Sequence, residues 1–173
     1  LRTGHCLCGA VSFTARLEAL NFGVCHCPMC RRWTGSALLG ITVDMDDVDW
    51  QGTNAIGIYQ SSAWAERAFC RSCGSAVFFR VTAETPYVGK IELPIGLFDD
   101  PNGLTMTNEI YIDHKPDSYA FAGANDRRQM TRGFLLRRQF GRRRFDNHPH
   151  FKQAPHEMRR RRPFEHPFED HGI

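Results

Sequence analysis

The seven cysteines of this 173-residue chain are confined to three short clusters. Two clusters hold two cysteines each and the third holds three: Cys6 and Cys8, Cys70 and Cys73, and Cys25, Cys27 and Cys30. Four thiolates complete a tetrahedral zinc site, whereas three leave one position for water or substrate, and this difference separates structural from catalytic zinc. The two pairs together therefore predict one structural zinc, and the triplet predicts a second zinc with an open position.

The two pairs share a feature beyond their spacing, because a glycine, Gly9 or Gly74, follows the second cysteine of each. A backbone that turns its amides toward metal-bound sulfur needs conformations that glycine permits. A zinc shared by the pairs would join the first strand to a central hairpin and stabilise folding directly, because the unfolded chain has no such site. A zinc ribbon that combines Cys27 and Cys30 with the last pair is the alternative partition. It would need an intervening segment of 39 residues, longer than usual, and would leave three cysteines unused.

The number and placement of the cysteines indicate a reducing compartment. Seven thiols cannot all pair with one another, and a disulfide within Cys-x-Cys would close a very small, strained ring. The first residues lack the features of a secretory signal, and no apolar run approaches the roughly 18 residues that span a bilayer. We therefore expect a cytoplasmic protein with no membrane association and with zinc as its metal. An iron–sulfur centre is the alternative that all-thiolate ligation allows.

Charge divides the chain into two parts. Residues 1–123 carry 9 Lys or Arg and 13 Asp or Glu, a net charge of −4, and residues 124–173 carry 13 and 6, a net charge of +7. The second part contains runs of three and four arginines and few branched aliphatic residues. We expect residues 1–123 to form a zinc-binding β domain and residues 124–173 to form a poorly ordered basic tail. An arm that binds nucleic acid or an acidic partner is the alternative for the tail.

Residue alternation in the first part predicts an all-β domain with little helix. Val11, Phe13 and Ala15 alternate with polar residues, which is the period of a strand with one buried face. Turn residues separate further short segments rich in strand formers: Ser36–Val43, Ala55–Gln60, Ala65–Phe69, Ala76–Thr82, Tyr87–Leu93 and Glu109–Asp113. Pro28 suits a first helical position, so Met29–Thr34 predicts a helix of one or two turns that Gly35 ends.

Basic residues follow the cysteine triplet directly. Arg31 and Arg32 come after it, and the expected helix begins within it; both features favour negative charge nearby. The two guanidinium groups would pair with carboxylates of a thiol substrate, or they are ordinary surface charges. His26 lies between two cysteines, so we expect its side chain to point away from a metal that both neighbours bind. For His5 and His114, which lie near a ligand and a strand end, surface or core positions are expected.

The three motifs, taken together, resemble those of a known family. They occupy Gly4–Phe13, Cys25–Gly35 and Phe69–Ser75, and the later segment Ile110–Asp117 resembles the closing strand of that family. In the order and spacing of these motifs the chain resembles the glutathione-dependent formaldehyde-activating enzyme (Gfa) family, which also includes centromere protein V. The resemblance covers about residues 3–123 and leaves the basic tail outside.

The resemblance implies a fold, a ligand set and a reaction. The fold is a small zinc-stabilised β-tent of stacked antiparallel sheets. The structural zinc would be held by Cys6, Cys8, Cys70 and Cys73, and the catalytic zinc by Cys25, Cys27 and Cys30. The reaction is that of a carbon–sulfur lyase, in which glutathione or a similar thiol and formaldehyde or a related aldehyde form S-(hydroxymethyl)glutathione or its analogue.

A mechanism follows as a hypothesis. The substrate thiol takes the open zinc position, loses its proton and attacks the aldehyde carbon, while zinc or a nearby donor stabilises the developing alkoxide. The alternative function is a non-catalytic zinc-binding module whose basic tail binds nucleic acid or an acidic partner. The cysteine spacing favours the enzyme, because it is a more specific signal than a run of charge.

Overall fold

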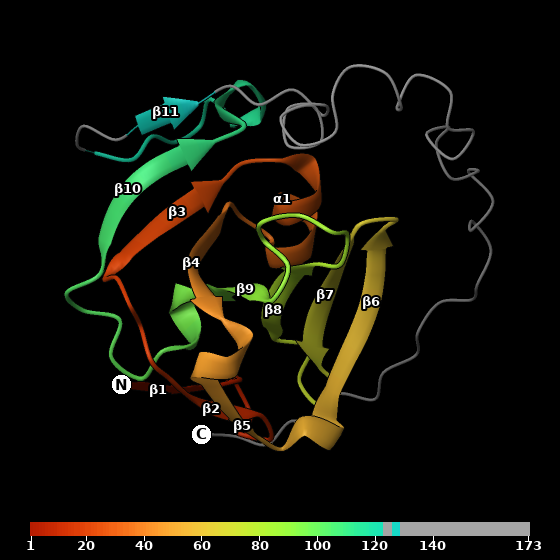
Figure 1. Ribbon diagram of the computed structural model, residues 1–173. Coiled ribbons are helices and arrows are strands. Elements are labelled where there is room, and N and C mark those ends of the chain that lie inside the picture. The colour runs from red at the N-terminus through yellow and green to blue at the C-terminus, as the bar shows by residue number, and fades with distance from the viewer. Residues whose placement is uncertain (123–125, 129–173) are drawn as a thin grey trace, which may run out of the picture. The chain divides into compact units, whose positions relative to one another are not determined.

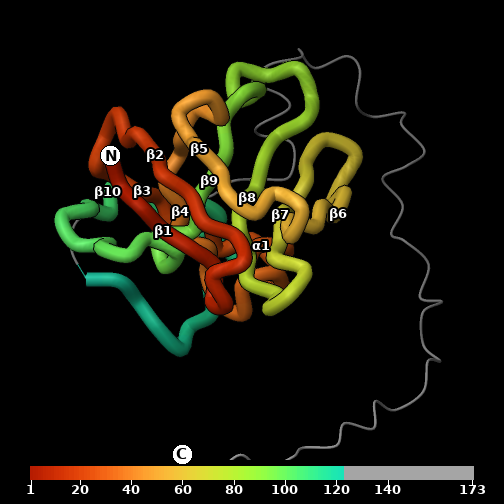
Figure 2. Tube along the Cα trace, turned by 90° about the horizontal axis from the view of Figure 1, so that it is seen from below, coloured from red at the N-terminus to blue at the C-terminus, as the bar shows by residue number. Residues whose placement is uncertain are grey.

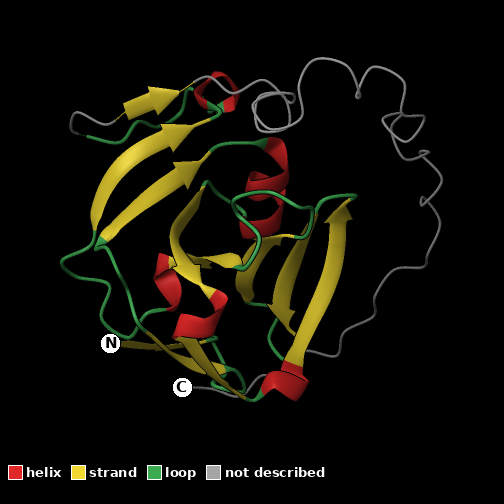
Figure 3. Ribbon diagram, in the orientation of Figure 1, coloured by secondary structure: helices red, strands yellow, loops and turns green. Residues whose placement is uncertain are grey.

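The computed structural model of the protein describes residues 1–122 and 126–128, and these are mainly strands and turns. Figure 3 shows helix confined to α1 (Pro28–Thr34) and to four single 3-10 turns within this part. The strands, in chain order, are β1 (Arg2–His5), β2 (Ser12–Ala15), β3 (Asn21–Cys25), β4 (Leu38–Asp44), β5 (Val48–Gln51), β6 (Ile56–Ser62), β7 (Ala65–Cys70), β8 (Ala76–Val81), β9 (Lys90–Pro94), β10 (Thr105–Ile110) and β11 (Asp126–Arg128). The 3-10 turns are η1 (Met45–Asp47), η2 (Thr53–Ala55), η3 (Ile95–Leu97) and η4 (Ile112–His114). The expected all-β class is confirmed.

The strands of the described part form two sheets (Figure 1). The smaller sheet has the order β1-β2-β5 and is antiparallel throughout. The larger sheet has the order β11-β10-β3-β4-β9-β8-β7-β6. Its pairings are antiparallel except at one edge, where β10 runs parallel to both β3 and β11. The parallel edge departs from the purely antiparallel sheets that the resemblance implies, because β10 returns to β3 from a distant part of the chain and not through a hairpin.

The two faces of the larger sheet bury different clusters of side chains. One face packs against the smaller sheet, and Phe13 of β2 lies in this core together with Ile41 and Val43 of β4. Figure 2 shows β1 and β2 crossing this face of the larger sheet. The opposite face carries α1, whose Trp33 packs with Leu38 of β4 and the cysteine triplet. Because neighbouring side chains of a strand point to opposite faces, the larger sheet separates the two clusters.

The local sequence around α1 accounts for its limits. Cys27 is the N-cap residue, and its sulfur accepts the Cys30 N–H at 3.4 Å. Pro28 occupies the first turn, where its missing N–H costs no hydrogen bond. Gly35 ends the helix in the left-handed conformation. The predicted helix is therefore confirmed, together with the residue that ends it.

Several strand predictions are confirmed and others differ. The alternation at Val11–Ala15 corresponds to β2, and the five segments from Ser36 to Leu93 correspond to β4 and β6–β9. The last predicted strand, Glu109–Asp113, is wrong in its limits: β10 ends at Ile110, because Tyr111 has a φ of 57° and leaves the extended region. Strands β1, β3 and β5 have no counterpart among the predicted segments, because they have four or five residues each and little alternation of apolar and polar residues.

The predicted division into a β domain and a basic tail remains a prediction. Within residues 124–173 the structure describes only β11, whose backbone pairs with β10. The arginine runs, and with them the alternative of a nucleic-acid-binding arm, lie outside the described residues. No helix within the described residues has the length and hydropathy needed to cross a bilayer.

Gly52 provides a direct test of the packing of the β5–β6 connection against the residues before β2. It has a φ of 70°, and an added Cβ would lie 1.9 Å from the carbonyl oxygen of Ala10, so both the backbone and the available space require glycine. We expect Gly52→Ala to lower the free energy of unfolding by about 3 kcal/mol, measured by denaturant titration. Gly96→Ala is the matched control, because a Cβ at Gly96 would meet no heavy atom within 4 Å. Equal stability of the two variants would contradict the described backbone at Gly52.

Candidate metal centres and active site

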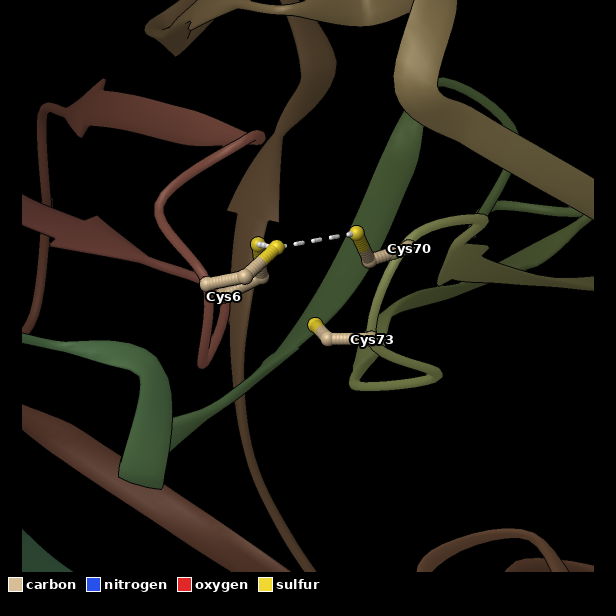
Figure 4. Close-up of side chains that lie close together, drawn as sticks. Cys6, Cys70 and Cys73 are labelled. Carbon is tan, nitrogen blue, oxygen red and sulfur yellow. Dashed lines mark hydrogen bonds between the residues drawn. The ribbon is translucent and has the colours of Figure 1, made fainter. Parts of the chain in front are cut away.

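The first cysteine cluster brings together two loops that are far apart in sequence. Cys6 and Cys8 follow β1, Cys70 ends β7, and Cys73 lies in the turn between β7 and β8. The four sulfurs lie within 4.8 Å of one another, with 3.6 Å between Cys6 Sγ and Cys8 Sγ and 3.9 Å between Cys8 Sγ and Cys70 Sγ. Figure 4 shows the sulfurs of Cys6, Cys70 and Cys73 turned toward one region. The two predicted cysteine pairs therefore converge on one point.

In each loop the glycine after the cysteine pair donates its N–H to the carbonyl of the first cysteine. The Gly9 N–H donates to the Cys6 carbonyl at 3.0 Å, and the Gly74 N–H donates to the Cys70 carbonyl at 2.8 Å. Both glycines have a positive φ, as the sequence predicts for turns around a metal. The hydroxyl of Ser75 connects the loops, because it accepts the Leu7 N–H at 3.1 Å and lies 3.2 Å from Cys73 Sγ.

The donor set of this first cluster fits zinc. A tetrahedral site with Zn–S bonds of about 2.3 Å separates its sulfurs by roughly 3.8 Å, close to the distances observed. Hydrogen bonds from Ser75 lower the pKa of Cys73 to about 5. For Cys8 the backbone N–H of Ala10 acts in the same direction, but partial burial and the neighbouring thiols outweigh it and raise the pKa to about 11. Four adjacent thiols resist joint ionisation, and a divalent cation removes that resistance.

The triplet forms a second cluster on the opposite face of the larger sheet. Cys25 ends β3, Cys27 caps α1 and Cys30 lies in its first turn, and their sulfurs lie within 4.8 Å of one another. Cys27 and Cys30 are buried and Cys25 is half-buried. Among the described residues, no further His, Cys, Asp or Glu joins this cluster. It therefore offers three sulfur ligands and leaves room for a fourth from outside the protein.

The thiols of the triplet are strongly coupled. Hydrogen bonds from Cys25 and Cys30, together with the backbone N–H groups that begin α1, lower the pKa of Cys27 to about 2. Cys25 is the thiol that donates to Cys27 and Cys30, and these hydrogen bonds raise its pKa. For Cys30 the Cys25 contact lowers the pKa, but the Cys27 contact and burial raise it to about 11. One thiolate shared among three sulfurs is the arrangement that a divalent cation converts to three thiolates, so the donor set fits zinc here as well.

The His26 side chain points away from the triplet, in agreement with its position between two cysteines. It is fully buried, and its Nε2 lies 3.0 Å from Glu109 Oε2 on β10. Its Nδ1 lies 3.2 Å from the Tyr119 hydroxyl. The ring therefore fastens the cysteine loop to β10 and to the segment that follows it.

The two other histidines considered from the sequence are not grouped with either cluster. His5 Nδ1 lies 2.7 Å from the carbonyl oxygen of Cys6, and its Nε2 lies 3.3 Å from Asp99. His114 Nε2 lies 3.6 Å from Asp113. Both rings are well exposed to solvent.

A cavity of about 250 Å³ lies beside α1 and the residues that follow its C-terminal end. Arg31, Arg32 and Tyr119 contribute to its lining, together with Gly35, Ser36 and Pro116. The Arg31 Nε also donates to the His26 carbonyl at 3.2 Å, which holds that guanidinium close to the cysteine loop. The two arginines that the sequence indicated therefore line one cavity, and one of them contacts the loop that carries the triplet.

Sequence reasoning missed two residues that approach the triplet. Arg67 of β7 places its Nη2 3.7 Å from Cys30 Sγ. Tyr111 packs against the triplet, and burial, together with the negative charge of the cysteines, raises its pKa to about 12. Neither residue belongs to a cysteine motif. Tyr111 lies in the segment Ile110–Asp117 that resembles the family, but only the fold shows that it and Arg67 approach the triplet.

The comparisons with known proteins agree with these motifs. A sequence profile described as glutathione-dependent formaldehyde-activating enzyme matches residues 1–114. The chain belongs to the glutathione-dependent formaldehyde-activating enzyme family. An uncharacterized lyase of Schizosaccharomyces pombe is 34% identical over 120 residues, which cover 69% of this chain and 84% of the relative.

The chain was also compared with solved structures. The crystal structure of a Rhodobacter sphaeroides protein covers 61% of this chain and 99% of its own, with 23% identity and a TM-score of 0.49. Membership of the family, together with the named relative, supports a lyase, and the two cysteine clusters are compatible with its zinc sites.

Glu92 on the α1 face of the larger sheet makes stability depend on pH. Burial raises the pKa of this carboxyl above its ordinary 4.5, although the hydroxyl of Thr42, 2.6 Å away, acts in the opposite direction. As pH rises through this window the unfolded chain loses a proton that the folded protein keeps, so stability falls. We expect the unfolding free energy of the wild type, relative to Glu92→Gln, to decrease as the pH rises above 4.5, the ordinary pKa of the carboxyl.

The measurement is denaturant titration at each pH. Glu84→Gln is the control, because Glu84 is an exposed carboxylate in the segment that follows β8. The cysteines titrate in both proteins, so their contribution to the pH dependence of stability cancels in the difference between wild type and variant. A difference between wild type and Glu92→Gln that does not change with pH would contradict the raised pKa.

Proposed function

We propose that the protein is a zinc-dependent carbon–sulfur lyase of the glutathione-dependent formaldehyde-activating type. It joins the thiol of glutathione, or of a similar small molecule, to formaldehyde or a related aldehyde, and it catalyses the reverse reaction. In the forward direction a carbon–sulfur bond forms, and the thiol proton passes to the aldehyde oxygen. The observation that carries the proposal is the triplet, whose three sulfurs lie within 4.8 Å of one another with no fourth protein ligand among the described residues.

The proposal assigns two zinc ions to each chain. Cys6, Cys8, Cys70 and Cys73 would hold a structural ion, because four sulfurs leave no position for a substrate. Cys25, Cys27 and Cys30 would hold the catalytic ion. An ion bound there supplies one kind of chemistry, which is to bind an incoming thiol in its deprotonated form.

The chain's own residues would orient the thiol substrate. Glutathione carries two carboxylates, and guanidinium groups bind carboxylates with paired hydrogen bonds. Arg31 and Arg32 line the cavity beside α1 and have no carboxylate partner among the ion pairs of the described part. Binding the carboxylates there would direct the thiol toward the cysteine cluster and fix its approach to the aldehyde.

We also propose that the protein acts in the cytoplasm. All seven cysteines lie within the described residues, and none forms a disulfide. Free thiols at this density are typical of a reducing compartment, where glutathione is also available.

Replacement of one triplet cysteine tests the catalytic centre. We expect Cys27→Ser to reduce the zinc content from two ions per chain to one and to abolish glutathione-dependent consumption of formaldehyde, because the three-sulfur site is lost. The fold should persist, as measured by circular dichroism, because the four-sulfur cluster is untouched. Cys70→Ser is the comparison variant. It should lose the ion of the four-sulfur cluster and, with it, folded structure. Full activity of Cys27→Ser with one zinc lost would refute the catalytic assignment.

Replacement of Arg31 tests the binding of substrate carboxylates. We expect Arg31→Ala to raise the KM for glutathione roughly tenfold, with a smaller change in kcat, because an interaction made equally in the ground and transition states is lost. The KM for 2-mercaptoethanol, which has no carboxylate, should not change. Arg16→Ala is the control, because Arg16 is a largely exposed arginine that pairs with Asp47. A similar rise for both thiols would show that Arg31 does not bind the carboxylates.

A further inference from the structure

Arg67 is a buried cation that points at the cysteine triplet. Its side chain is 4% exposed, and its Nη2 lies 3.7 Å from Cys30 Sγ. Its Nη1 donates to the Ser61 hydroxyl, and its Nε is buried with no hydrogen-bond partner among the described residues. The rings of Trp33 and Phe79 lie 5.5 and 5.0 Å from its Cζ, so aromatic faces replace water around the guanidinium.

The charge of Arg67 lacks a carboxylate to balance it. None of the ion pairs of the described residues includes it, whereas Arg80, on the neighbouring strand, pairs with Glu66 at 2.6 Å. Arginine remains protonated at every accessible pH, and burial of an unbalanced charge is costly. The neighbouring group that can carry negative charge is Cys30, which the guanidinium approaches directly. The balancing charge therefore lies on the cysteine triplet.

The strand that carries Arg67 also carries a ligand of the other cluster. Ala68 and Cys70 face the core shared with the smaller sheet, and Arg67 faces α1. The side chain thus leaves β7 toward the triplet, while Cys70 leaves it toward the four-sulfur cluster. No other arginine or lysine of the described residues makes a hydrogen bond to a cysteine sulfur in either cluster.

We propose that Arg67 is a positioning residue that allows the three-cysteine centre to accept an anionic fourth ligand, the thiolate of the substrate. The inference rests on the proposed function, because it assumes a divalent metal bound by the triplet. Three thiolates and a divalent cation carry one net negative charge, which repels a further anion. The buried guanidinium balances that charge, so an incoming thiolate meets a neutral centre in surroundings where charges interact strongly.

A purely structural role for Arg67 predicts a different outcome. If the side chain served only to pack α1 against the sheet through Trp33, its loss would disturb the site for every ligand equally. If Arg67 balances charge, its loss should weaken the binding of a thiolate much more than the binding of a neutral ligand such as imidazole. The guanidinium attracts the anionic ligand and has little effect on the neutral one. The ratio of the two affinities separates these roles.

The experiment measures ligand affinity at the metal directly. Wild type, Arg67→Met, Arg67→Lys and Arg80→Met are loaded with cobalt, whose visible absorption reports on its ligands, and are titrated with glutathione and with imidazole. We expect Arg67→Met to weaken glutathione binding by at least about tenfold relative to imidazole binding. Arg67→Lys, which keeps the charge, should recover most of the loss. Arg80→Met, which removes a half-exposed arginine stacked on Phe78, should match the wild type.

Each outcome decides between the roles. Equal loss of both ligands in Arg67→Met, or a lysine variant that behaves like the methionine variant, overturns the inference. If Arg67→Met does not fold, Arg67→Gln takes its place as the uncharged variant, with the same expectations. A wild type that binds cobalt and glutathione but does not consume formaldehyde contradicts the proposed function and leaves the inference standing. A wild-type triplet that binds no cobalt overturns both.

Discussion

Repulsion among converging cysteine sulfurs is the constraint on which the described structure depends. Seven sulfurs meet at two points, and neither group ionises completely without a cation, because each thiolate disfavours its neighbours. At the first point, Cys8 and Cys70 are 62 residues apart in sequence, so an ion bound by both would close a long loop and connect the residues after β1 to the end of β7. Small cores gain much from such a link, since their buried apolar area is limited.

The larger sheet gives the two clusters separate roles. Its one face shares a core with the smaller sheet, and the four-sulfur cluster lies at the edge of this core. Its other face carries α1 and the triplet, next to a cavity lined by arginines. Strand β7 serves both, because Cys70 and Arg67 leave it in opposite directions. One strand thus carries a cysteine of the four-sulfur cluster and a buried positive charge that approaches the three-sulfur cluster.

The sequence predicted those features whose causes are local. The cysteines lie in short motifs, and Pro28 and Gly35 delimit α1, so the triplet and the helix follow from a few neighbouring residues, while the count of cysteines predicted that the two pairs converge. Strand β3 has no clear alternation, and its parallel pairing with β10 depends on residues more than eighty positions away. Arg67 contacts Cys30, which is 37 residues away in sequence. The residues next to Arg67 in sequence do not distinguish it from an arginine on the solvent-exposed face of a strand. Such features depend on tertiary contacts, which single-sequence patterns do not contain.

Unequal sulfur coordination is the central claim, and cadmium NMR of the protein with cadmium in place of zinc tests it most directly. The account predicts two resonances: one from a four-sulfur site, which does not change when glutathione is added, and one from a three-sulfur site, which shifts toward the first as a fourth sulfur binds. A single resonance per chain, or two resonances that are both unchanged by glutathione, would contradict it.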